Sequence, residues 1–451
     1  MKKKYTYNLF MMLLLSSFLL LGTLSGCNQA PSAIKNITNE EPTLQVDGSL
    51  SWIRHVNRSQ PEEFLIPDEI QEMITDYLGV YHFSLAKLSE EDITSFFSQD
   101  SPESIKSALT NQAALHYLIT LRNMLPHDMT IPEFRIILNP VSLTPFEEED
   151  RESTPDLVTL TLYEHRYQHF SFASPIASSS TRIEHHFVID VSSKEPVIYL
   201  HQKFEDADFL IREHFEQFFE PAEAEAFNQK LFVSNLNRST EDLLVLAKSN
   251  LSNRKIALAE QNSDSENQTL LQATNDYNRQ AAVAYAMEWV DPLKIKRNPE
   301  WDVYDDLGGN CNNFVSQSLF AGGIPMDTTG HIDSQWKWYD NRINSRQTER
   351  GRSPSWAGVN EFYKYVNSNT GSGMVATTQA NYYDGELGDI ILFGYNGRWK
   401  HAVIITGIIK DDDGRVIDYL INSNTADQIL YPVSAYGYYE ITLIKIIGFN
   451  E

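Results

Sequence analysis

The sequence predicts an α+β protein, and the hydrophobic period along the chain supports this class. From Pro61 to about Met129, apolar residues recur three and four positions apart, as they do on one face of a helix. Between Asp156 and Asp206, apolar and polar residues alternate, and valine, isoleucine, threonine, tyrosine and phenylalanine are frequent, as in β-strands. Helices followed by an antiparallel set of strands indicate an α+β domain.

The N-terminal domain is predicted at 61–205. Its predicted elements are helices at 67–81 and 101–125 and strands at 156–172, 181–191 and 196–206. Ser101 is of the preferred N-cap type, and Pro102 suits the first turn of the second helix. The order of these elements resembles the curved-sheet cone of nuclear-transport-factor-like domains. Residues 206–274 are again predicted to be helical, and they connect this domain to a C-terminal domain at 275–451.

Residues 1–26 have the features of a secretory signal peptide. Three lysines precede an apolar run from Leu9 to Leu21, which is too short to span a bilayer, and small residues follow. The segment "LSGC", which ends at Cys27, resembles a bacterial lipobox, and this resemblance implies cleavage before Cys27 and lipidation of its sulfur. We therefore expect an extracytoplasmic lipoprotein with residues 27–60 as a polar tether. The alternative is an ordinary signal peptide in which Cys27 has no role.

The cysteine count and the charge limit the possible partners and bonds. Cys27 and Cys311 are the two cysteines of the chain, so once Cys27 carries lipid no intramolecular disulfide can form. The formal net charge is -25, and removal of the three signal-peptide lysines takes it to about -28. Nucleic acids and anionic lipids bind to basic patches, so neither is expected to bind the folded part of the protein.

The segment "NCNNFVSQSLFAGG" predicts a helix that starts at Cys311. Asn310 is of a preferred N-cap type, and Gly322 and Gly323 end the helix. Five residues share one face of this helix: Cys311, Phe314, Val315, Ser318 and Leu319. The dipole and the unpaired N–H groups of a helix start favour an anion. They lower the pKa of a thiol there and can hold a developing oxyanion.

A thiol nucleophile needs a base, and two of the twelve histidines follow Cys311, namely His331 and His401. Strands are predicted at 389–393 and 401–409, which places His401 at the start of the second strand, beside the loop "GYNGRWK". His331 lies in a loop without such a frame, so we favour His401. From the residues alone, a structural cysteine and a structural histidine are equally good interpretations.

The imidazole also needs an acceptor that orients it. Asn422 and Asn424 alternate along the next predicted strand and therefore face one side, and Asp418 has the same parity further upstream. These residues by themselves leave the choice open.

Two other residue groups suggest sites but have simpler interpretations. Five histidines lie on the predicted N-terminal strands without the ligand spacing of a zinc site, and we expect them to be surface or half-buried residues: His165, His169, His185, His186 and His201. Trp336, Trp338 and Trp399 could line a cleft, but core packing explains them as well. No metal or cofactor is expected.

Five C-terminal segments occur in the order seen in one family of bacterial surface proteins. They are "YNRQAAVAYAMEWV", "NCNNFVSQSLFAGGIPMD", "SPSWAGVNEFYKYV", "GELGDIILF" and "KHAVIITGI". Over about 276–451 the chain thus resembles the putative amidase domain family, which is similar to papain-like cysteine hydrolases of the NlpC and CHAP type. The resemblance implies that Cys311 is the nucleophile, that His401 is the base and that a third group lies within "NSNTAD".

Two positions depart from the pattern of this family. Asn310 stands where the family often has aspartate, which removes a negative charge beside the thiol but keeps a capping side chain. Asn424 stands near a position where the family tends to have histidine, so the choice between Asn422 and Asn424 stays open.

These observations predict a lipid-anchored, extracytoplasmic thiol hydrolase of amide bonds. Cys311 and His401 would carry the reaction, and the backbone N–H beside Asn310 would help to hold the oxyanion. Cell-wall peptide is the expected substrate class, because of the predicted location alone. Two alternatives stay open, namely a binding or assembly lipoprotein with an inactive site, and an acyl or peptidyl transferase that uses the same thiol.

Overall fold

The computed structural model describes residues 46–53, 66–146, 156–205, 209–216, 227–260, 271–339 and 351–451. The predicted signal peptide and Cys27 lie outside these ranges, so the lipid anchor stays a prediction. Leu44–Glu451 forms one compact unit. Within the described ranges, no helix combines the length and the apolar character needed to cross a membrane.

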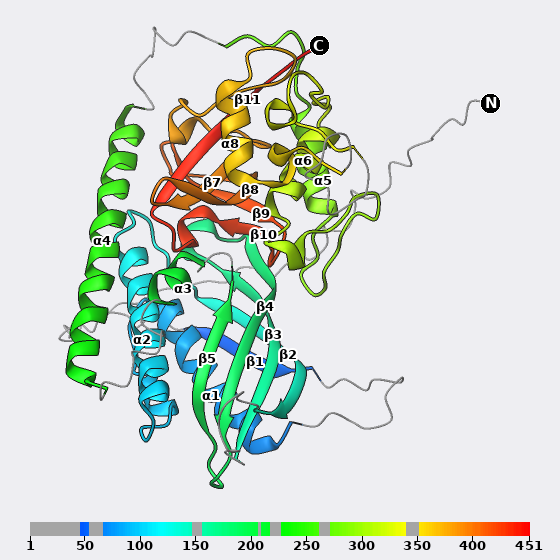
Figure 1. Cartoon of the computed structure of the whole chain (residues 1–451). Coiled ribbons are helices and arrows are strands. Elements are labelled where there is room, and N and C mark those ends of the chain that lie inside the picture. Colours follow the sequence, from blue (N-terminus) through cyan, green and yellow to red (C-terminus); the bar gives the residue numbers. More distant parts are fainter. Residues whose placement is uncertain are drawn as a thin grey trace, which may run out of the picture. The chain divides into compact units, whose positions relative to one another are not determined.

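A large, mostly antiparallel sheet organises the described residues (Figure 1). Its strand order is β1-β2-β3-β4-β10-β9-β8-β7-β11-β6, and β5 pairs with β4. The strands of the N-terminal half are β1 Asp47–Trp52, β2 Glu133–Pro145, β3 Leu157–His169, β4 Ala177–Asp190 and β5 Val197–Phe204. Those of the C-terminal half are β6 Gly373–Thr377, β7 Ile390–Tyr395, β8 Arg398–Lys410, β9 Val416–Ser423, β10 Asp427–Pro432 and β11 Glu440–Asn450. The predicted mixed α+β class is confirmed.

The helices form two groups, in which some helices pack on the strands and others pack on those helices (Figure 1). The N-terminal group is α1 Asp68–Lys87 and α2 Pro102–Asn123, followed by α3 Phe209–Glu216 and α4 Gln229–Glu260. The C-terminal group is α5 Arg279–Glu288, α6 Cys311–Ala321, α7 Pro354–Ala357 and α8 Val359–Ser368. The predicted cap of α2 is confirmed, because Ser101 accepts hydrogen bonds from the backbone N–H groups of Glu103 and Ser104.

Two strands differ from the sequence prediction. Asp47–Trp52 lies in the predicted tether, but it forms β1 and pairs in parallel with β2. No strand is predicted at β2 from the sequence, because Pro140 and Pro145 interrupt it and proline is depleted in strands. The structure accommodates Pro140 at an irregularity of the β2–β3 pairing.

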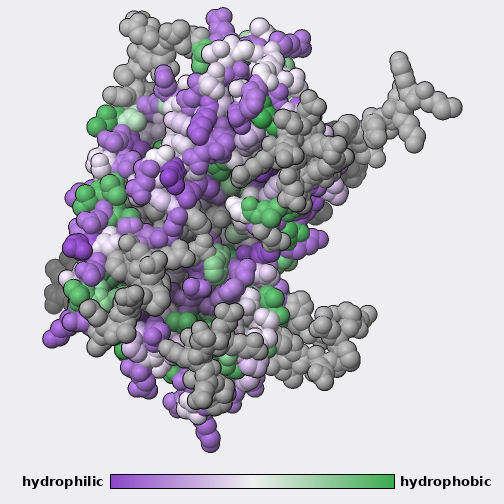
Figure 2. Space-filling view, viewed as in Figure 1, coloured by the Kyte–Doolittle hydropathy of each residue, from purple (hydrophilic) through white to green (hydrophobic). Residues whose placement is uncertain are grey.

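Two apolar clusters lie on opposite faces of the C-terminal strands. The first, here named the α6 cluster, includes Phe314 of α6 and Ala402 and Ile404 of β8. The second, the central cluster, includes Val403 and Ile405 and continues into the N-terminal half. Because side chains alternate along a strand, β8 is buried on both faces. On the outer face shown in Figure 2, hydrophilic residues predominate and apolar residues form scattered small groups, in keeping with the acidic composition.

The two predicted domains share the sheet. Asp427 of β10 pairs with Thr181 of β4, and the Ser178 hydroxyl donates to the Leu430 carbonyl at 2.6 Å. The predicted boundary near residue 274 therefore separates two halves whose strands are hydrogen-bonded to each other, and it stays a prediction.

Candidate active site

Cys311 is the first residue of α6 and is 6 % exposed. The predicted helix is confirmed over Cys311–Ala321, and Gly323, with a φ of +91°, follows its end. At Gly322 a side chain would collide with the Tyr277 ring, so the close approach of α5 requires glycine there. The apolar side of α6 lies in the α6 cluster, so Cys311 is held at a buried helix start.

Asn310 occupies the N-cap position, but its side chain does not cap the helix, which corrects the prediction. Its Oδ1 accepts hydrogen bonds from the Tyr304 backbone N–H at 3.1 Å and from Asn313 Nδ2 at 2.9 Å. Its Nδ2 donates to Asn424 Oδ1 at 3.0 Å. The Asn310 side chain therefore makes no hydrogen bond to the first N–H groups of α6.

The other polar residues of the motif anchor α6 to α7. Asn312 Nδ2 donates to the carbonyl of Ser355 at 3.0 Å, and Asn313 Oδ1 accepts from the Trp356 indole at 2.9 Å. The Ser316 hydroxyl donates to the Trp356 carbonyl at 2.7 Å. The side chains that make this segment distinctive thus fix the position of the Cys311 backbone.

The β7–β8 hairpin places His401 deeper than the sequence predicts. The predicted loop "GYNGRWK" is a tight turn at Asn396 and Gly397, whose φ angles are 51° and 69°. Asn-Gly is the preferred pair for a turn of this kind, and this signal in the sequence was missed. As a result β8 begins at Arg398, and His401 lies within it, opposite Phe393 and only 2 % exposed.

The ring of His401 lies among aromatic rings. Its centroid is 6.1 Å from that of Phe393 and 5.7 Å from that of Tyr436. Burial lowers the pKa of His401 to about 3. The imidazole is therefore neutral at neutral pH, the form that can accept a proton.

Tyr436 and Gln428 extend this contact, and no pattern in the sequence points to either residue. Tyr436 Oη lies 3.5 Å from His401 Nε2 and donates its proton to Gln428 Oε1. Gln428 Oε1 can only accept, so the Tyr436 proton points toward it and the Tyr436 oxygen is left as an acceptor for His401 Nε2. In this tautomer Nε2 carries the proton of the imidazole, and the lone pair on Nδ1 is the site that accepts a proton.

The start of α6, with Cys311, and the first part of β8, with His401, lie toward the same end of the strands. β8 begins and β9 ends there, because the two strands are antiparallel. Thr425, just beyond β9, accepts a hydrogen bond from the Asn310 backbone N–H at 2.8 Å and so holds the start of α6 at this end. Cys311 belongs to the α6 cluster, whereas the His401 ring packs against residues of the central cluster, on the other face of the strands. The pairing of Cys311 with His401 stays a prediction.

Asn422 and Asn424 each contact other groups. Asn422 Nδ2 donates to the Ala286 carbonyl at 3.0 Å, and its Oδ1 accepts from the Thr406 hydroxyl at 2.9 Å. Asn424 accepts from Asn310, as described above. These bonds brace α5 and the start of α6, and a role in orienting His401 stays a prediction for both.

Asp418, the third alternative, lies at the contact with the N-terminal half. Its Oδ2 accepts from the Ser434 hydroxyl and is 3.9 Å from His127 Nε2. His127 follows α2, so this carboxylate connects β9 to the N-terminal helices.

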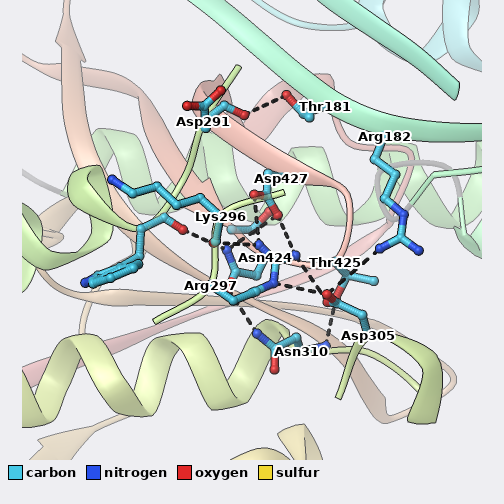
Figure 3. A network of polar contacts seen from close by, with 12 residues as sticks. Thr181, Arg182, Asp291, Lys296, Arg297, Asp305, Asn310, Asn424, Thr425 and Asp427 are labelled. Atoms are coloured by element: carbon cyan, nitrogen blue, oxygen red, sulfur yellow. Dashed lines mark hydrogen bonds and ion pairs between the residues drawn. The ribbon is translucent and has the colours of Figure 1, made fainter. Parts of the chain in front are cut away.

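A buried ionic network continues from Asn424 toward the N-terminal half (Figure 3). Arg297 pairs with Asp427 at 2.7 Å and with Asp305 at 3.1 Å, and Asn424 Nδ2 is 3.5 Å from Asp427 Oδ1. Arg182 of β4 lies 4.0 Å from Asp305. Burial raises the pKa of Asp427 to about 6. The network thus connects β4 to the residues that hold the start of α6.

Asp389 of the "GELGD" segment has a structural role. It is fully buried, pairs with Arg279 of α5 at 2.6 Å, and accepts hydrogen bonds from the backbone N–H groups of Glu386 and Ile446. The segments "YNRQ" and "GELGD" therefore meet in one buried ion pair that fixes α5 against the sheet.

The tryptophans favour the core interpretation. Trp336 and Trp338 are 0 % and 9 % exposed and belong to the α6 cluster. Trp399 packs against Tyr363, with ring centroids 5.3 Å apart. Across the described ranges, no group of three or more His, Cys, Asp or Glu side chains is placed to hold a metal ion.

Comparison with known proteins gives a family match for the C-terminal part of the chain. Residues 276–447 match the model of the family described as a putative amidase domain, which confirms the resemblance noted in the sequence. The uncharacterized protein YhbB of Bacillus subtilis (strain 168) is 31% identical over 144 residues, which cover 32% of this chain and 40% of the relative. The chain therefore spans less than half the length of this relative. No solved structure matches the chain.

Proposed function

We propose that the C-terminal part of the protein is a thiol hydrolase that cleaves amide bonds, with Cys311 as its nucleophile. The observation that carries the proposal is the position of Cys311 as the first residue of α6, inside a region that matches a putative amidase domain. A helix start lowers the pKa of a thiol and presents N–H groups to an oxyanion. The packing of α6 on an antiparallel sheet supports the papain-like plan.

The proposed reaction uses His401 first as base and then as acid. Cys311 Sγ attacks the amide carbonyl carbon, and the thiol proton passes to His401 Nδ1 while the N–H groups of the first turn of α6 hold the oxyanion. The amine leaves with the proton from His401. Water then gives a proton to His401 and attacks the thioester, which releases the acid and returns the thiol. No step needs a metal or an organic cofactor.

Tyr436 and Gln428 are the proposed positioning residues for His401. Their contacts with Nε2 fix the tautomer in which Nδ1 is the base. From the sequence, Asn422 or Asn424 was expected to orient the His401 ring in this way.

The proposed location is the outer side of a membrane, with lipid on Cys27. The order of lysines, apolar run, small residues and cysteine in residues 1–27 supports it. Cell-wall peptide is the proposed substrate class on the strength of that location. For the N-terminal half, two helices beside the β1–β5 strands support the nuclear-transport-factor-like cone (Figure 1).

The test is hydrolysis of cell-wall peptides and simple acyl amides by the wild type and by Cys311→Ala. We expect the variant to lose activity, while Ser318→Ala, which removes another buried polar group of α6, keeps it. Hydrolysis that persists in Cys311→Ala contradicts the mechanism. Transfer of the acyl group to an added amine, rather than to water, would identify a transferase.

One observation favours a second candidate, a binding or assembly protein with an inactive site. His401 is only 2 % exposed, and its ring stacks on Phe393. Iodoacetamide labelling at neutral pH separates the two candidates, because a reactive thiol at Cys311 is expected to be labelled much faster than free cysteine.

A further inference from the structure

A cavity lies in the N-terminal half, between the helices and the β4–β5 strands. Its volume is about 170 Å³. Six apolar side chains from α1, α2, α3 and β5 line it: Leu78, Ala114, Leu118, Phe204, Ile211 and Phe215. An apolar protein cavity of about 150 Å³ is large enough to bind benzene, so this space suits a ligand with one ring.

Two buried imidazoles, those of His185 and His201, belong to the polar part of the lining. Tyr77 Oη is 2.8 Å from His201 Nδ1, His201 Nε2 is 3.0 Å from His185 Nδ1, and His185 Nε2 is 3.3 Å from Glu164. These contacts from behind the lining hold the two rings in place.

This arrangement differs from the surface or half-buried histidines that the sequence predicts. His165, His185 and His201 are 4 %, 1 % and 5 % exposed. His185 lies next to Glu164, and His201 lies next to His185. The sequence does not reveal these contacts, because the three residues belong to three different strands.

The charged groups near the cavity are paired with one another. Glu164 contacts Arg166 at 2.6 Å, Arg166 contacts Glu205 at 3.2 Å, and Glu205 contacts Lys203 at 3.3 Å. Burial lowers the pKa of His201 well below its usual value, so this imidazole is neutral. Two carboxylates thus balance two cations, and a charged ligand would lose its hydration without gaining a counter-charge.

One hydroxyl of the lining is not used by the protein. Thr110 lines the cavity, and its Oγ1 is buried and has no hydrogen-bond partner within the described part of the chain. Other helical hydroxyls, such as those of Ser84 and Thr240, donate to the carbonyl four residues earlier. This hydroxyl lies behind the surface of the cavity, so it adds no exposed polar group to the lining.

We propose that this cavity is a binding site for an uncharged ligand about the size of one six-membered ring. The site lies in the N-terminal half and is independent of the proposed hydrolase. Its ligand would be recognised by apolar packing, without ion pairing.

The first experiment titrates the full-length protein with phenol, benzoate and benzylammonium by calorimetry and ligand-observed NMR at pH 7. We expect phenol to bind with a Kd below about 1 mM and the two charged probes to bind at least about tenfold more weakly. Absence of phenol binding up to about 10 mM, or equal binding of a charged probe, overturns the proposal.

Variants locate the binding. Ala114→Leu fills the cavity and is expected to abolish phenol binding, whereas Ala113→Leu, its neighbour on α2, faces the groove toward α4 and is the matched control. Phenol binding that survives in folded Ala114→Leu overturns the proposal. Where Ala114→Leu fails to fold, the comparison of phenol with the two charged probes on the wild type still decides it.

Discussion

Buried histidines occur in both halves of the protein, but in different surroundings. In the N-terminal half, His82 lies 2.9 Å from Glu164, a carboxylate that Arg166 also contacts. In the C-terminal half, His401 packs against aromatic rings such as that of Phe393. Burial lowers the pKa of both histidines, but Glu164 offsets part of this effect at His82. The His82 ring is therefore held by a paired carboxylate, whereas the His401 ring is neutral and lies among aromatic rings.

The largest expected difference between the two environments is catalytic. We expect His401→Gln to lower kcat/KM for amide hydrolysis by about 10³-fold, because the reaction loses its base. His82→Gln still donates to Glu164, so its kcat/KM is expected to stay within about threefold of the wild type, with a stability loss of about 1–2 kcal/mol. Steady-state kinetics and urea unfolding measure both, and equal catalytic losses in the two variants would contradict the contrast.

Glu164→Gln tests whether the carboxylate holds the N-terminal cluster together. We expect a loss of about 3 kcal/mol in the free energy of unfolding, because buried Arg166 loses one of its two carboxylate partners and keeps only Glu205. The control is Glu184→Gln on the neighbouring strand, which breaks the exposed pair with His186 and should cost at most about 1 kcal/mol. A small effect at Glu164 would show that the cluster is not a determinant of stability.

The pH dependence of stability tests the environment of His401. Its folded-state pKa of about 3 lies below the unfolded value of 6.5, so the unfolded chain binds the proton first. The contribution is fully present above pH 6.5 and is lost as pH falls toward 3, by about 2 kcal/mol between pH 7 and 5. Asp427, with a raised pKa of about 6, acts in the opposite direction.

To isolate His401, urea unfolding at pH 7 and 5 should compare the wild type with His401→Phe, since Asp427 and the other histidines are present in both. We expect a shallower slope in the variant. Equal slopes would mean that the imidazole is hydrated in the folded protein.

The smallest expected effects come from two tyrosines that contact the histidines. Tyr436→Phe is expected to lower kcat about three- to tenfold at constant KM, because His401 loses the group that fixes its tautomer. Tyr77→Phe removes the hydroxyl that donates to His201 and should leave kcat unchanged while costing about 1 kcal/mol of stability. A change in KM alone for Tyr436→Phe would argue against a positioning role.

Local signals in the sequence predicted the elements that carry the proposed chemistry. The face formed by Phe314, Val315 and Leu319 predicted α6, and Ser101 and Pro102 predicted the start of α2. Such signals work because capping and amphipathic packing act within a few residues of the chain.

Features that depend on contacts between distant residues could not be predicted from such local signals. β1 is a polar strand that exists because β2 pairs with it, and His401 became buried because Asn396-Gly397 forms a tight turn. Tyr436 and Gln428 follow His401 by more than twenty residues, and no local pattern connects them to its ring.

The sequence by itself determined the α+β class, the helix that begins at Cys311, and the resemblance of the C-terminal part to an amidase domain. Only the tertiary structure decided which groups surround His401, that Asn310 braces Asn424 instead of capping α6, and that Glu164 gathers buried histidines around a cavity. The physical reason is that periodicity and capping are encoded in neighbouring residues. Burial, tautomers and charge compensation depend on side chains brought together across the sheet.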